Sequence, residues 1–323
     1  MMKKIFWILL DNRMGSVGQA KGIEQELDTN LFEVVEKNLV YSRWAGLPNI
    51  IRRDTLLGIT NPEILQSGIP DFVLSTSRRT VSAALYLKKH HPHVHLLQLM
   101  FPGRYGADQF DKIFLPFHDA NKKVMPNFYF TTGSPHRINA KTLRESADLW
   151  QSHFDKLPRP LTALIIGGAI KGKTFTQENA AALAHAVLAL KHKIGGSLLV
   201  TDSRRTGADA EHLIMEILKD IPSHRFLWGS QDKNPLLGYY ACADNIIVTG
   251  DSVSMCCEAC GTGKPVFIFE GNRWLTAKHL RFTQSLFDGH YAVRLEQGCD
   301  TFVGGKILYP SAEIAEEIAK LVK

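Results

Sequence analysis

The sequence predicts an α/β protein made of two domains of similar design. Short apolar, β-branched runs alternate with helix-like segments along 323 residues, a length sufficient for two domains. The sequence Ser-Arg-Arg-Thr occurs twice, at residues 77–80 and 203–206, and each copy follows an apolar run and precedes a helix-like segment. In an open α/β sheet such a turn lies at the carboxyl end of a strand, where ligands bind. We therefore expect two α/β domains that face each other across a cleft lined with arginine.

The predicted strands are short runs that are apolar on both faces. Such strands are typical of parallel sheets covered by helices on both sides. They lie at residues 5–10, 32–35, 72–75, 94–100 and 112–115 in the first half, and at 161–166, 197–201, 225–228, 245–249 and 265–269 in the second. The clearest helices between them lie at residues 18–27, 81–89, 179–192, 209–218 and 252–260.

The domain boundary is predicted near residue 156. Residues 141–154 form a helix-like segment, and the following Leu-Pro-Arg-Pro at 157–160 stiffens the chain before a new strand. We expect an N-terminal domain of residues 1–156 and a C-terminal domain of residues 157–323. A last helix is predicted at 312–322, and it can pack back on the N-terminal domain.

Charge and composition limit the classes of function. The 38 basic and 32 acidic residues give a net charge of +6, which suits anionic ligands or an anionic membrane surface. The excess is too dispersed to predict nucleic-acid binding. No apolar run is long enough to span a bilayer, and the first one is too short for a signal peptide, so we expect a cytoplasmic protein.

The five cysteines predict neither disulfides nor a metal site. Their odd number and their clustering in the last third of the chain favour reduced thiols. Cys257 and Cys260 have the spacing of metal ligands, but no second pair accompanies them. We expect them to be small packing residues and expect no metal.

Two segments of the first half carry candidate catalytic side chains. Asp11 follows the first strand and can act as a general base or cap a turn. The glycines that follow, Gly15 and Gly18, lack the full dinucleotide fingerprint. His118 and Asp119 follow the fifth strand, where they can do acid–base work or hold a loop by hydrogen bonds.

A third segment of the first half, residues 41–57, mixes apolar and basic side chains. It combines Trp44 and several isoleucines and leucines with Arg43, Arg52 and Arg53. One interpretation is an interfacial patch for an anionic membrane or a lipid-linked substrate. The other is a partly buried helix whose arginines extend to solvent.

Two segments of the second half have the composition of phosphate-binding turns. Residues 165–177 combine Gly167, Gly168 and Gly172 with Lys171 and Lys173. Thr174 and Gln177 can form a capping box for the next helix. The alternative is an ordinary glycine-rich βα turn. The register of a Walker A loop is not met.

Residues 249–265 are the most specific segment. Gly250 permits a turn, and Asp251 and Ser252 can cap a helix whose first N–H groups would face a phosphate. Glu258, about two turns into that helix, can accept hydrogen bonds from ribose hydroxyls. The alternative is a capped crossover helix with a solvated glutamate.

Four segments resemble the family of mitochondrial fission proteins named for elongated mitochondria in plants: residues 110–119, 126–133, 201–206 and 249–265. Many members are bacterial, and the family is in turn similar to glycosyltransferases of the GT-B fold. This resemblance implies two Rossmann-like domains, with a nucleotide-sugar held mainly by the C-terminal one. The histidine that often occupies the first loop of GT-B transferases is absent here, and Gly15-Ser-Val-Gly-Gln19 stands in its place.

The resemblance, together with the motifs, implies the following sites. Catalysis would use Asp11, His118 and Asp119. The nucleotide-sugar site would comprise Gly167, Gly168, Lys171, Ser203, Arg204, Arg205, Thr206, Gly250, Asp251, Ser252, Ser254 and Glu258, with Glu258 on the ribose. The cleft would be lined by Arg13, Gly15, Gln19, Ser77, Arg78 and Arg79.

The function implied is metal-independent transfer from a nucleotide-sugar near the inner membrane, with no cofactor beyond that substrate. The acceptor can be lipid-linked, and weak peripheral association with anionic membrane is expected. A nucleotide-sugar 2-epimerase of the same fold and a non-catalytic adaptor are the alternatives. The plant relatives, linked to recruitment of a dynamin-like protein, represent the adaptor class.

Overall fold

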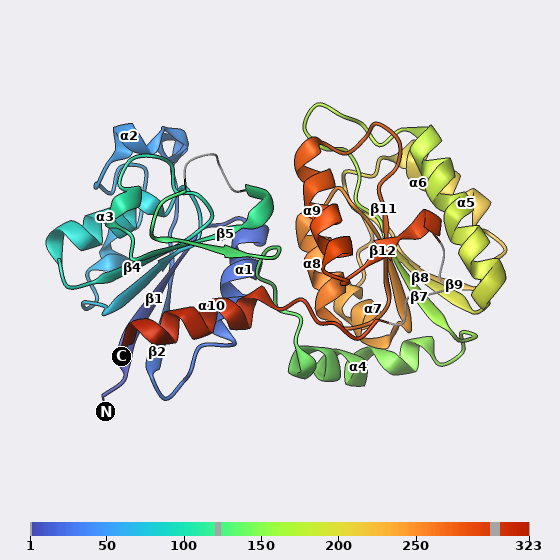
Figure 1. Cartoon of the computed structure of the whole chain (residues 1–323), viewed down its shortest axis with the longest axis horizontal. Coiled ribbons are helices and arrows are strands. Elements are labelled where there is room, and N and C mark those ends of the chain that lie inside the picture. The colour runs from blue at the N-terminus through green and yellow to red at the C-terminus, as the bar shows by residue number, and fades with distance from the viewer. Residues whose placement is uncertain (1, 120–123, 298–303, 323) are drawn as a thin grey trace. The chain divides into compact units, whose positions relative to one another are not determined.

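The computed structural model describes residues 2–119, 124–297 and 304–322, and it divides the chain into two compact units. Unit 1 comprises Met1–Arg137 and Tyr309–Lys323, and unit 2 comprises Ile138–Leu308. Each unit contains one six-stranded sheet in which every pair of neighbouring strands is parallel. The predicted α/β class with two parallel sheets is confirmed (Figure 1).

Unit 1 has the strand order β2-β1-β3-β4-β5-β6. The strands are β1 (Lys4–Leu10), β2 (Phe32–Asn38), β3 (Phe72–Ser75), β4 (His95–Leu99), β5 (Lys112–Pro116) and β6 (Phe128–Thr131). The helices are α1 (Met14–Glu24), α2 (Asn49–Arg52), α3 (Val81–His90) and α10 (Pro310–Ala319). Alternate residues of β1 enter the two cores of the unit: Trp7 and Leu9 pack with α3, and Phe6 and Ile8 pack with α1 and α10.

Unit 2 has the strand order β12-β11-β10-β7-β8-β9, the order of a dinucleotide-binding Rossmann sheet. Its strands are β7 (Leu161–Ile165), β8 (Ser197–Thr201), β9 (Ser223–Phe226), β10 (Asn245–Thr249), β11 (Val266–Phe269) and β12 (Val293–Arg294). Its helices are α4 (Ala140–Phe154), α5 (Gln177–Ile194), α6 (Ala208–Ile217), α7 (Leu236–Cys242), α8 (Val253–Gly261) and α9 (Ala277–Asp288). Helices α5 and α6 cover one face, and α4, α7, α8 and α9 contribute to the core on the other.

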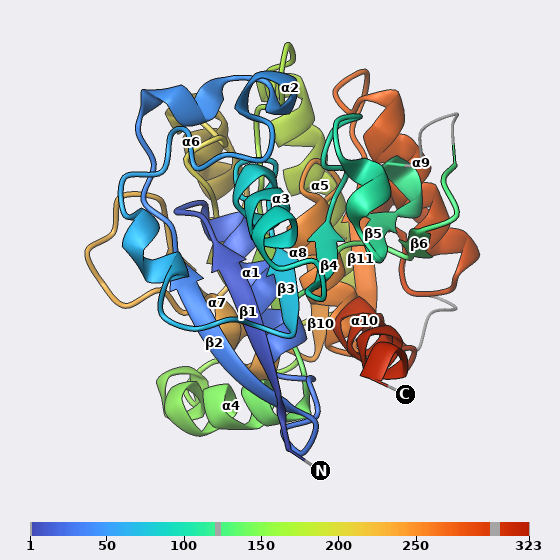
Figure 2. The ribbon, with the colours of Figure 1, turned by 90° about the vertical axis from the view of Figure 1, so that its left-hand side faces the viewer.

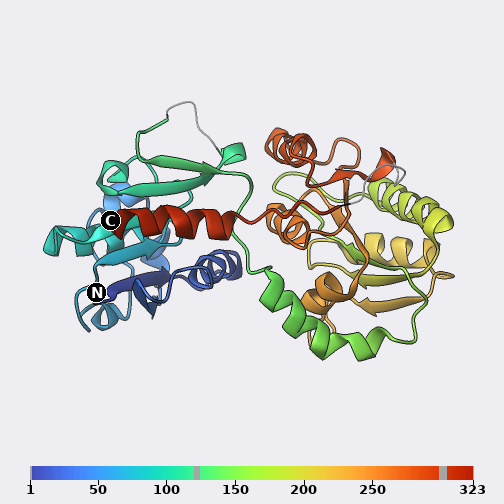
Figure 3. The ribbon, with the colours of Figure 1, turned by 60° about the horizontal axis from the view of Figure 1, so that its bottom comes forward.

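The boundary between the units differs from the predicted one at residue 156. Helix α4 belongs to unit 2 (Figure 3), because Trp150 packs against α7, where an added side chain at Gly238 would meet the indole at 2.3 Å. The last helix, α10, belongs to unit 1, where Ile314, Ala315 and Ile318 join the core beside α1. Ser311 Oγ also accepts from the backbone N–H of His136 and donates to its carbonyl oxygen.

Several elements differ in extent from their predictions or were not expected. Helix α1 begins at Met14 instead of residue 18, so the glycines at 15 and 18 lie inside it. Strand β9 ends at Phe226, two residues before the predicted end. Among the described residues, the strands and α-helices that were not expected are β6, α7, α9 and β12.

Candidate functional site

In unit 2 the turns that follow β7 and β10 lie side by side, because these two strands are neighbours although they are far apart in sequence. The sheet order reverses between them, and ligands of open α/β sheets bind outside the carboxyl ends of strands at such a point. The sequence-predicted glycine-rich turn at 167–172 and the turn at 250–252 therefore meet at one edge of the sheet.

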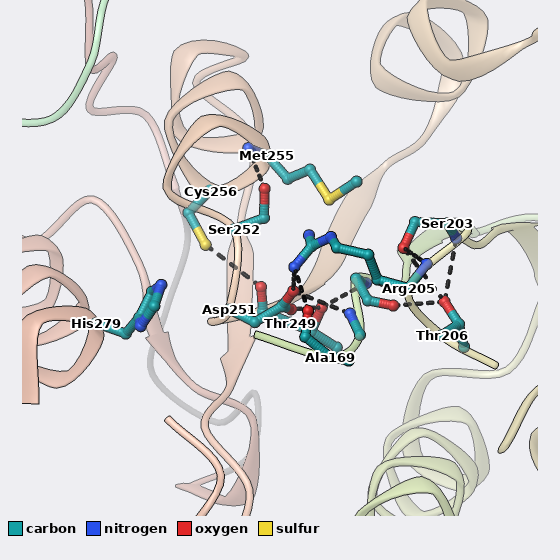
Figure 4. Close-up of polar contacts among 12 residues, drawn as sticks. Ala169, Ser203, Arg205, Thr206, Thr249, Asp251, Ser252, Met255, Cys256 and His279 are labelled. Atoms are coloured by element: carbon teal, nitrogen blue, oxygen red, sulfur yellow. Dashed lines mark hydrogen bonds and ion pairs between the residues drawn. The ribbon is translucent and has the colours of Figure 1, made fainter. Parts of the chain in front are cut away.

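Asp251 holds these turns together. Its side chain is fully buried, accepts hydrogen bonds from the Gly168 N–H (2.9 Å) and the Thr249 hydroxyl (2.7 Å), and forms an ion pair with Arg205 (2.8 Å) (Figure 4). Arg205 also donates to the Ala169 carbonyl at 3.0 Å. The expectation that Asp251 caps α8 is wrong, because its oxygens are used by the neighbouring turns. Ser252 is the N-cap and accepts from the Met255 N–H at 3.5 Å.

The glycines of these turns make room for protein atoms. A Cβ at Gly167 would lie 2.1 Å from an Asp251 carboxylate oxygen, and one at Gly168 would lie 2.0 Å from the Arg205 carbonyl group. Gly250 is buried against Leu275 and does not have a positive φ. These three glycines are thus explained by close packing at the sheet edge.

The rest of the glycine-rich loop is anchored at Lys173, which donates to the carbonyls of Arg273 and Leu275. Lys171 and Gly172 are exposed. Thr174 was expected to begin a capping box, but Thr176 is the N-cap of α5 and accepts from the Asn179 N–H at 3.2 Å.

The two Ser-Arg-Arg-Thr turns have the same hydrogen bonds. Ser77 and Ser203 each donate a backbone N–H to the threonine three residues later, both at 3.1 Å. Their hydroxyls accept from the backbone N–H groups of Arg79 and Arg205. In both turns the second arginine reaches the neighbouring turn: Arg79 donates to Asn12 at 3.4 Å, as Arg205 does to Ala169. The first arginines, Arg78 and Arg204, are exposed.

Next to the start of α8 lies a cavity of about 440 Å³ at the carboxyl ends of β7, β8 and β9. Its walls combine aromatic and apolar with polar side chains, and its lining comprises Ile165, Thr201, Asp202, Ser203, Phe226, Trp228, Gly229, Ser230, Gln231, Asn234, Leu236 and Met255. Of the predicted nucleotide-sugar residues, only Ser203 lines it. The exposed Trp228, in a Gly- and Ser-containing segment directly after a strand, is the sequence signal that could have located it.

Asp202 is the ionisable group of this cavity. Burial raises its pKa to about 6, although the Trp228 backbone N–H, which donates to the carboxylate at 2.6 Å, acts in the opposite direction. Near neutral pH this carboxyl therefore sits close to the boundary between its two protonation states.

Glu258, on α8, lies 3.5 Å from the hydroxyl of the buried Tyr240, which donates to it. The carboxylate is partly exposed and is not among the residues that line the cavity. Ser254 is exposed in the first turn of the same helix. The ribose role of Glu258 thus stays a prediction.

His279, in the first turn of α9, was not singled out from the sequence. Figure 4 shows its ring beside the Asp251–Ser252 turn, and the Thr276 hydroxyl holds its Nδ1 at 2.7 Å. Burial lowers its pKa, and Asp251 raises it to a lesser degree. A neutral imidazole therefore stands beside the turn that begins α8.

In unit 1 the carboxyl end of β1 carries Asp11, whose side chain is buried. One carboxylate oxygen accepts from the Arg13 N–H at 3.1 Å, and the other has no hydrogen-bond partner among the described residues. Gly15 and Gln19, which were predicted to line a cleft, lie on α1. His118 is buried in the short 3-10 helix Phe117–Asp119, with its Nε2 3.9 Å from an Asp119 oxygen.

Among the residues that the structure describes, no group of three or more His, Cys, Asp or Glu side chains is placed to hold a metal ion. Cys256, Cys257 and Cys260 lie in the unit 2 core and form no disulfide, and Cys299 lies outside the described residues. No described helix is both long and apolar enough to cross a membrane.

The model of the family described as mitochondrial fission ELM1 matches residues 14–322. "Mitochondrial fission protein ELM1" of Arabidopsis thaliana is 30% identical over 247 residues, which are 69% of this chain but only 57% of the plant protein. "Uncharacterized protein RP120" of Rickettsia prowazekii (strain Madrid E) is 28% identical, over 98% of this chain and 97% of its own length.

Solved structures with two-domain GT-B architecture are similar over the whole chain. The UDP-GlcNAc 2-epimerase of Methanocaldococcus jannaschii has a TM-score of 0.57 at 11% identity and covers 98% of this chain and 99% of its own. The Neisseria meningitidis UDP-GlcNAc 2-epimerase bound to UDP-GlcNAc has a TM-score of 0.53 at 14% identity, covering 99% of each chain. A glycosyltransferase of Rickettsia africae has a TM-score of 0.50 at 12% identity, covering 99% of this chain and 88% of its own. At such identities the similarity shows the fold, which is GT-B-like.

Proposed function

Because the chain belongs to the mitochondrial fission ELM1 family and has a GT-B-like fold, we propose that unit 2 binds a nucleotide-sugar and that the protein is a metal-independent glycosyltransferase. The observation that carries the proposal is the cavity beside the start of α8, at the carboxyl ends of β7, β8 and β9. A second cavity, between the starts of α5 and α6, is lined by Asp209 and by Arg205, whose charge is already paired with Asp251, so its lining offers a diphosphate no uncompensated cation.

The chemistry of the first cavity suits a nucleobase. Trp228 is 63% exposed and Phe226 is half-buried, so aromatic faces are available on which a planar base can stack. Gln231 and Asn234 offer amide donors and acceptors to the edge of the base, and Asp202 offers a carboxyl group. An apolar pocket with a few polar groups is the usual form of such a site.

The diphosphate would lie at the start of α8, whose first backbone N–H groups and positive dipole end favour an anion. Arg205 is already paired with the buried Asp251, so its charge is largely compensated. Arg204, which is exposed, is the arginine we assign to the phosphates. Glu258 would accept from the ribose hydroxyls.

For transfer, the acceptor hydroxyl would attack the anomeric carbon while the bond from that carbon to the diphosphate oxygen breaks. The hydroxyl proton would pass to a general base, and the negative charge of the leaving diphosphate would be stabilised by α8 and Arg204. Asp11 suits the role of base because one of its buried oxygens has no partner among the described residues. His118, beside Asp119, is the second candidate.

The acceptor we propose is lipid-linked, which would bring the protein to the cytoplasmic surface of the inner membrane. The experiment begins with a thermal-shift panel of nucleoside diphosphates. A ligand present at 100 times its Kd raises the free energy of unfolding by about 2.7 kcal/mol. NMR of the matching nucleotide-sugar then follows its fate with a membrane extract as acceptor. Sugar transferred to lipid supports the proposal, whereas a free or bound 2-epimer indicates an epimerase. No nucleotide binding at all indicates an adaptor.

A further inference from the structure

The short helix α2 of unit 1 buries its polar side chains and exposes its apolar ones. Asn49 and Arg52, three residues apart on one face, point inward and are buried, and Arg52 is 0% exposed. Ile50 and Ile51, on the other side, are 64% and 55% exposed. The sequence interpretation in which Arg52 extends to solvent or contacts a membrane is therefore wrong.

The inward side chains are held by hydrogen bonds to backbone and hydroxyl groups. Asn49 donates to the Pro102 carbonyl at 2.7 Å. Arg52 donates to the Leu57 carbonyl at 3.1 Å, the Arg79 carbonyl at 2.8 Å and the Ser82 hydroxyl at 2.6 Å. These bonds fix the orientation of α2, and the isoleucines on its other side therefore face solvent. Large apolar groups that remain exposed together mark a surface that contacts something.

Three more exposed side chains flank the isoleucines in the sequence: Trp44, Arg43 and Arg53. We call the five residues Arg43, Trp44, Ile50, Ile51 and Arg53 the α2 patch. The Arg43 guanidinium lies 5.1 Å from the centre of the Trp44 ring. Arg53 has a φ of 47°, a strained conformation for a side chain of this size.

The segment that carries the α2 patch has charges of one sign. Residues 40–53 contain no acidic side chain. The acid that follows, Asp54, is paired with Lys89 at 2.7 Å. The arginines of the patch are thus not offset by a neighbouring free carboxylate in this segment.

We infer that the α2 patch is a docking surface for an anionic lipid bilayer. Tryptophan partitions to the membrane–water interface, isoleucines enter the acyl boundary, and arginines attract anionic headgroups. Arg52 ties the patch to the turn after β3, and Figure 2 shows α2 at the end of unit 1 toward which β1 and β2 run. Docking would hold the carboxyl edge of this sheet at the membrane. The inference gives the proposed transferase a route to a lipid-linked acceptor, but its test uses no nucleotide.

The test is flotation of the full chain with phosphatidylcholine vesicles and with mixed phosphatidylcholine–phosphatidylglycerol vesicles. We expect the protein to float with the mixed vesicles at low salt and much less at high salt or with phosphatidylcholine alone. The double variant Arg43→Glu, Arg53→Glu should bind at least about twenty-five-fold less, since the loss of each basic residue alone costs about fivefold. Ile50→Glu with Ile51→Glu should also abolish flotation.

The matched control is Leu149→Glu with Leu280→Glu, which places the same charges on exposed apolar positions of unit 2. It should float as the wild type does. Brominated lipids should quench Trp44, so Trp44→Phe should lose most of the vesicle-dependent quenching. Nucleoside-diphosphate binding should be unchanged in all patch variants, which separates this inference from the proposed function.

Three results would overturn the inference. The first is no flotation of the wild type at low salt. The second is equal flotation of the patch and control variants. The third is vesicle-independent self-association that Ile50→Glu with Ile51→Glu removes, which would make the α2 patch a protein interface.

Discussion

The guanidinium of Arg205 lies 2.8 Å from the carboxylate of Asp251, whose side chain is fully buried. The pair joins the turn after β8 to the turn after β10, and the same carboxylate holds the Gly168 N–H of the turn after β7. Three strand ends are thus fixed relative to one another by one acid. The candidate nucleotide site is built on this framework.

Arg205→Ala should destabilise unit 2 by about 2–4 kcal/mol, because it leaves a buried carboxylate without its counter-charge. Arg204→Ala is the matched control in the same turn. Because this side chain is exposed, its removal should lower the free energy of unfolding by less than about 0.5 kcal/mol. Urea unfolding measures both free energies. Equal losses in the two variants would show that the ion pair does not support the fold.

The glycines of the turn after β7 should differ in their tolerance of alanine. At Gly168 the added Cβ would lie 2.0 Å from backbone atoms of Arg205, so Gly168→Ala should prevent native packing of this edge. A Cβ added at Gly172 would have no atom within 4 Å. Only the positive φ of 79° opposes a side chain there, at a cost of about 1 kcal/mol in stability. Thermal unfolding should separate the two variants clearly, and similar melting temperatures would contradict the close approach.

The stability contributed by Asp202 should fall as the pH rises. Its folded pKa of about 6 lies above the usual value for an unfolded aspartate. The folded state therefore binds more protons between about pH 4 and pH 6, and this stabilisation is lost as the pH passes through 6. Asp202→Asn keeps an acceptor oxygen for the Trp228 N–H but has no charge to bury.

As the pH rises from roughly 4 to 7, the free energy of unfolding of Asp202→Asn should thus increase by about 1 kcal/mol relative to that of the wild type. This figure is reduced for solvent screening, because the group is partly exposed. Thermal unfolding across this range provides the measurement, with Asp209→Asn as an exposed control. A difference that is constant with pH would contradict the raised pKa.

Glu258→Ala should weaken nucleoside-diphosphate binding by roughly 1.5–3 kcal/mol, since a charged hydrogen bond to ribose is lost. The fold should tolerate the change, because the Tyr240 hydroxyl also donates to the Met255 carbonyl at 3.4 Å.

Arg204→Ala should weaken the binding of diphosphates more than the binding of nucleosides, and the effect should be largest at low salt. Calorimetric titration at two salt concentrations tests both, and unchanged affinity at an unchanged melting temperature would remove Glu258 from the site.

The alternation of apolar runs and helices sufficed to predict two parallel sheets, and the repeated Ser-Arg-Arg-Thr turns do occupy matching strand ends. What the sequence could not supply were partners distant along the chain. Asp251 looked like a cap because Ser252 and a helix follow it, yet its oxygens serve Gly168 and Arg205. Arg52 looked like a surface charge, but two of its partners are distant in sequence, in the turn after β3 and at the start of α3.

The domain boundary was misplaced for a similar reason. Helix α4 precedes the proline-rich segment and is amphipathic, so the sequence alone does not say which sheet it covers. That choice is made by Trp150, which packs where Gly238 of α7 has no side chain. The cavity residues Phe226 and Trp228 were overlooked because strand β9 was expected to continue to residue 228.

The proposed function depends on the binding of a nucleoside diphosphate by unit 2, in the cavity lined by Trp228. Calorimetric titration of UDP, GDP and ADP into the wild type, Trp228→Ala and Trp44→Ala tests it most directly, with Trp44 as a comparably exposed tryptophan of unit 1. We expect one of the nucleotides to bind the wild type and Trp44→Ala equally, and Trp228→Ala to bind it more weakly by roughly 1–3 kcal/mol, the contribution of one base-stacking contact. Binding of none of the three nucleotides, or equal affinities of Trp228→Ala and the wild type, would contradict the account.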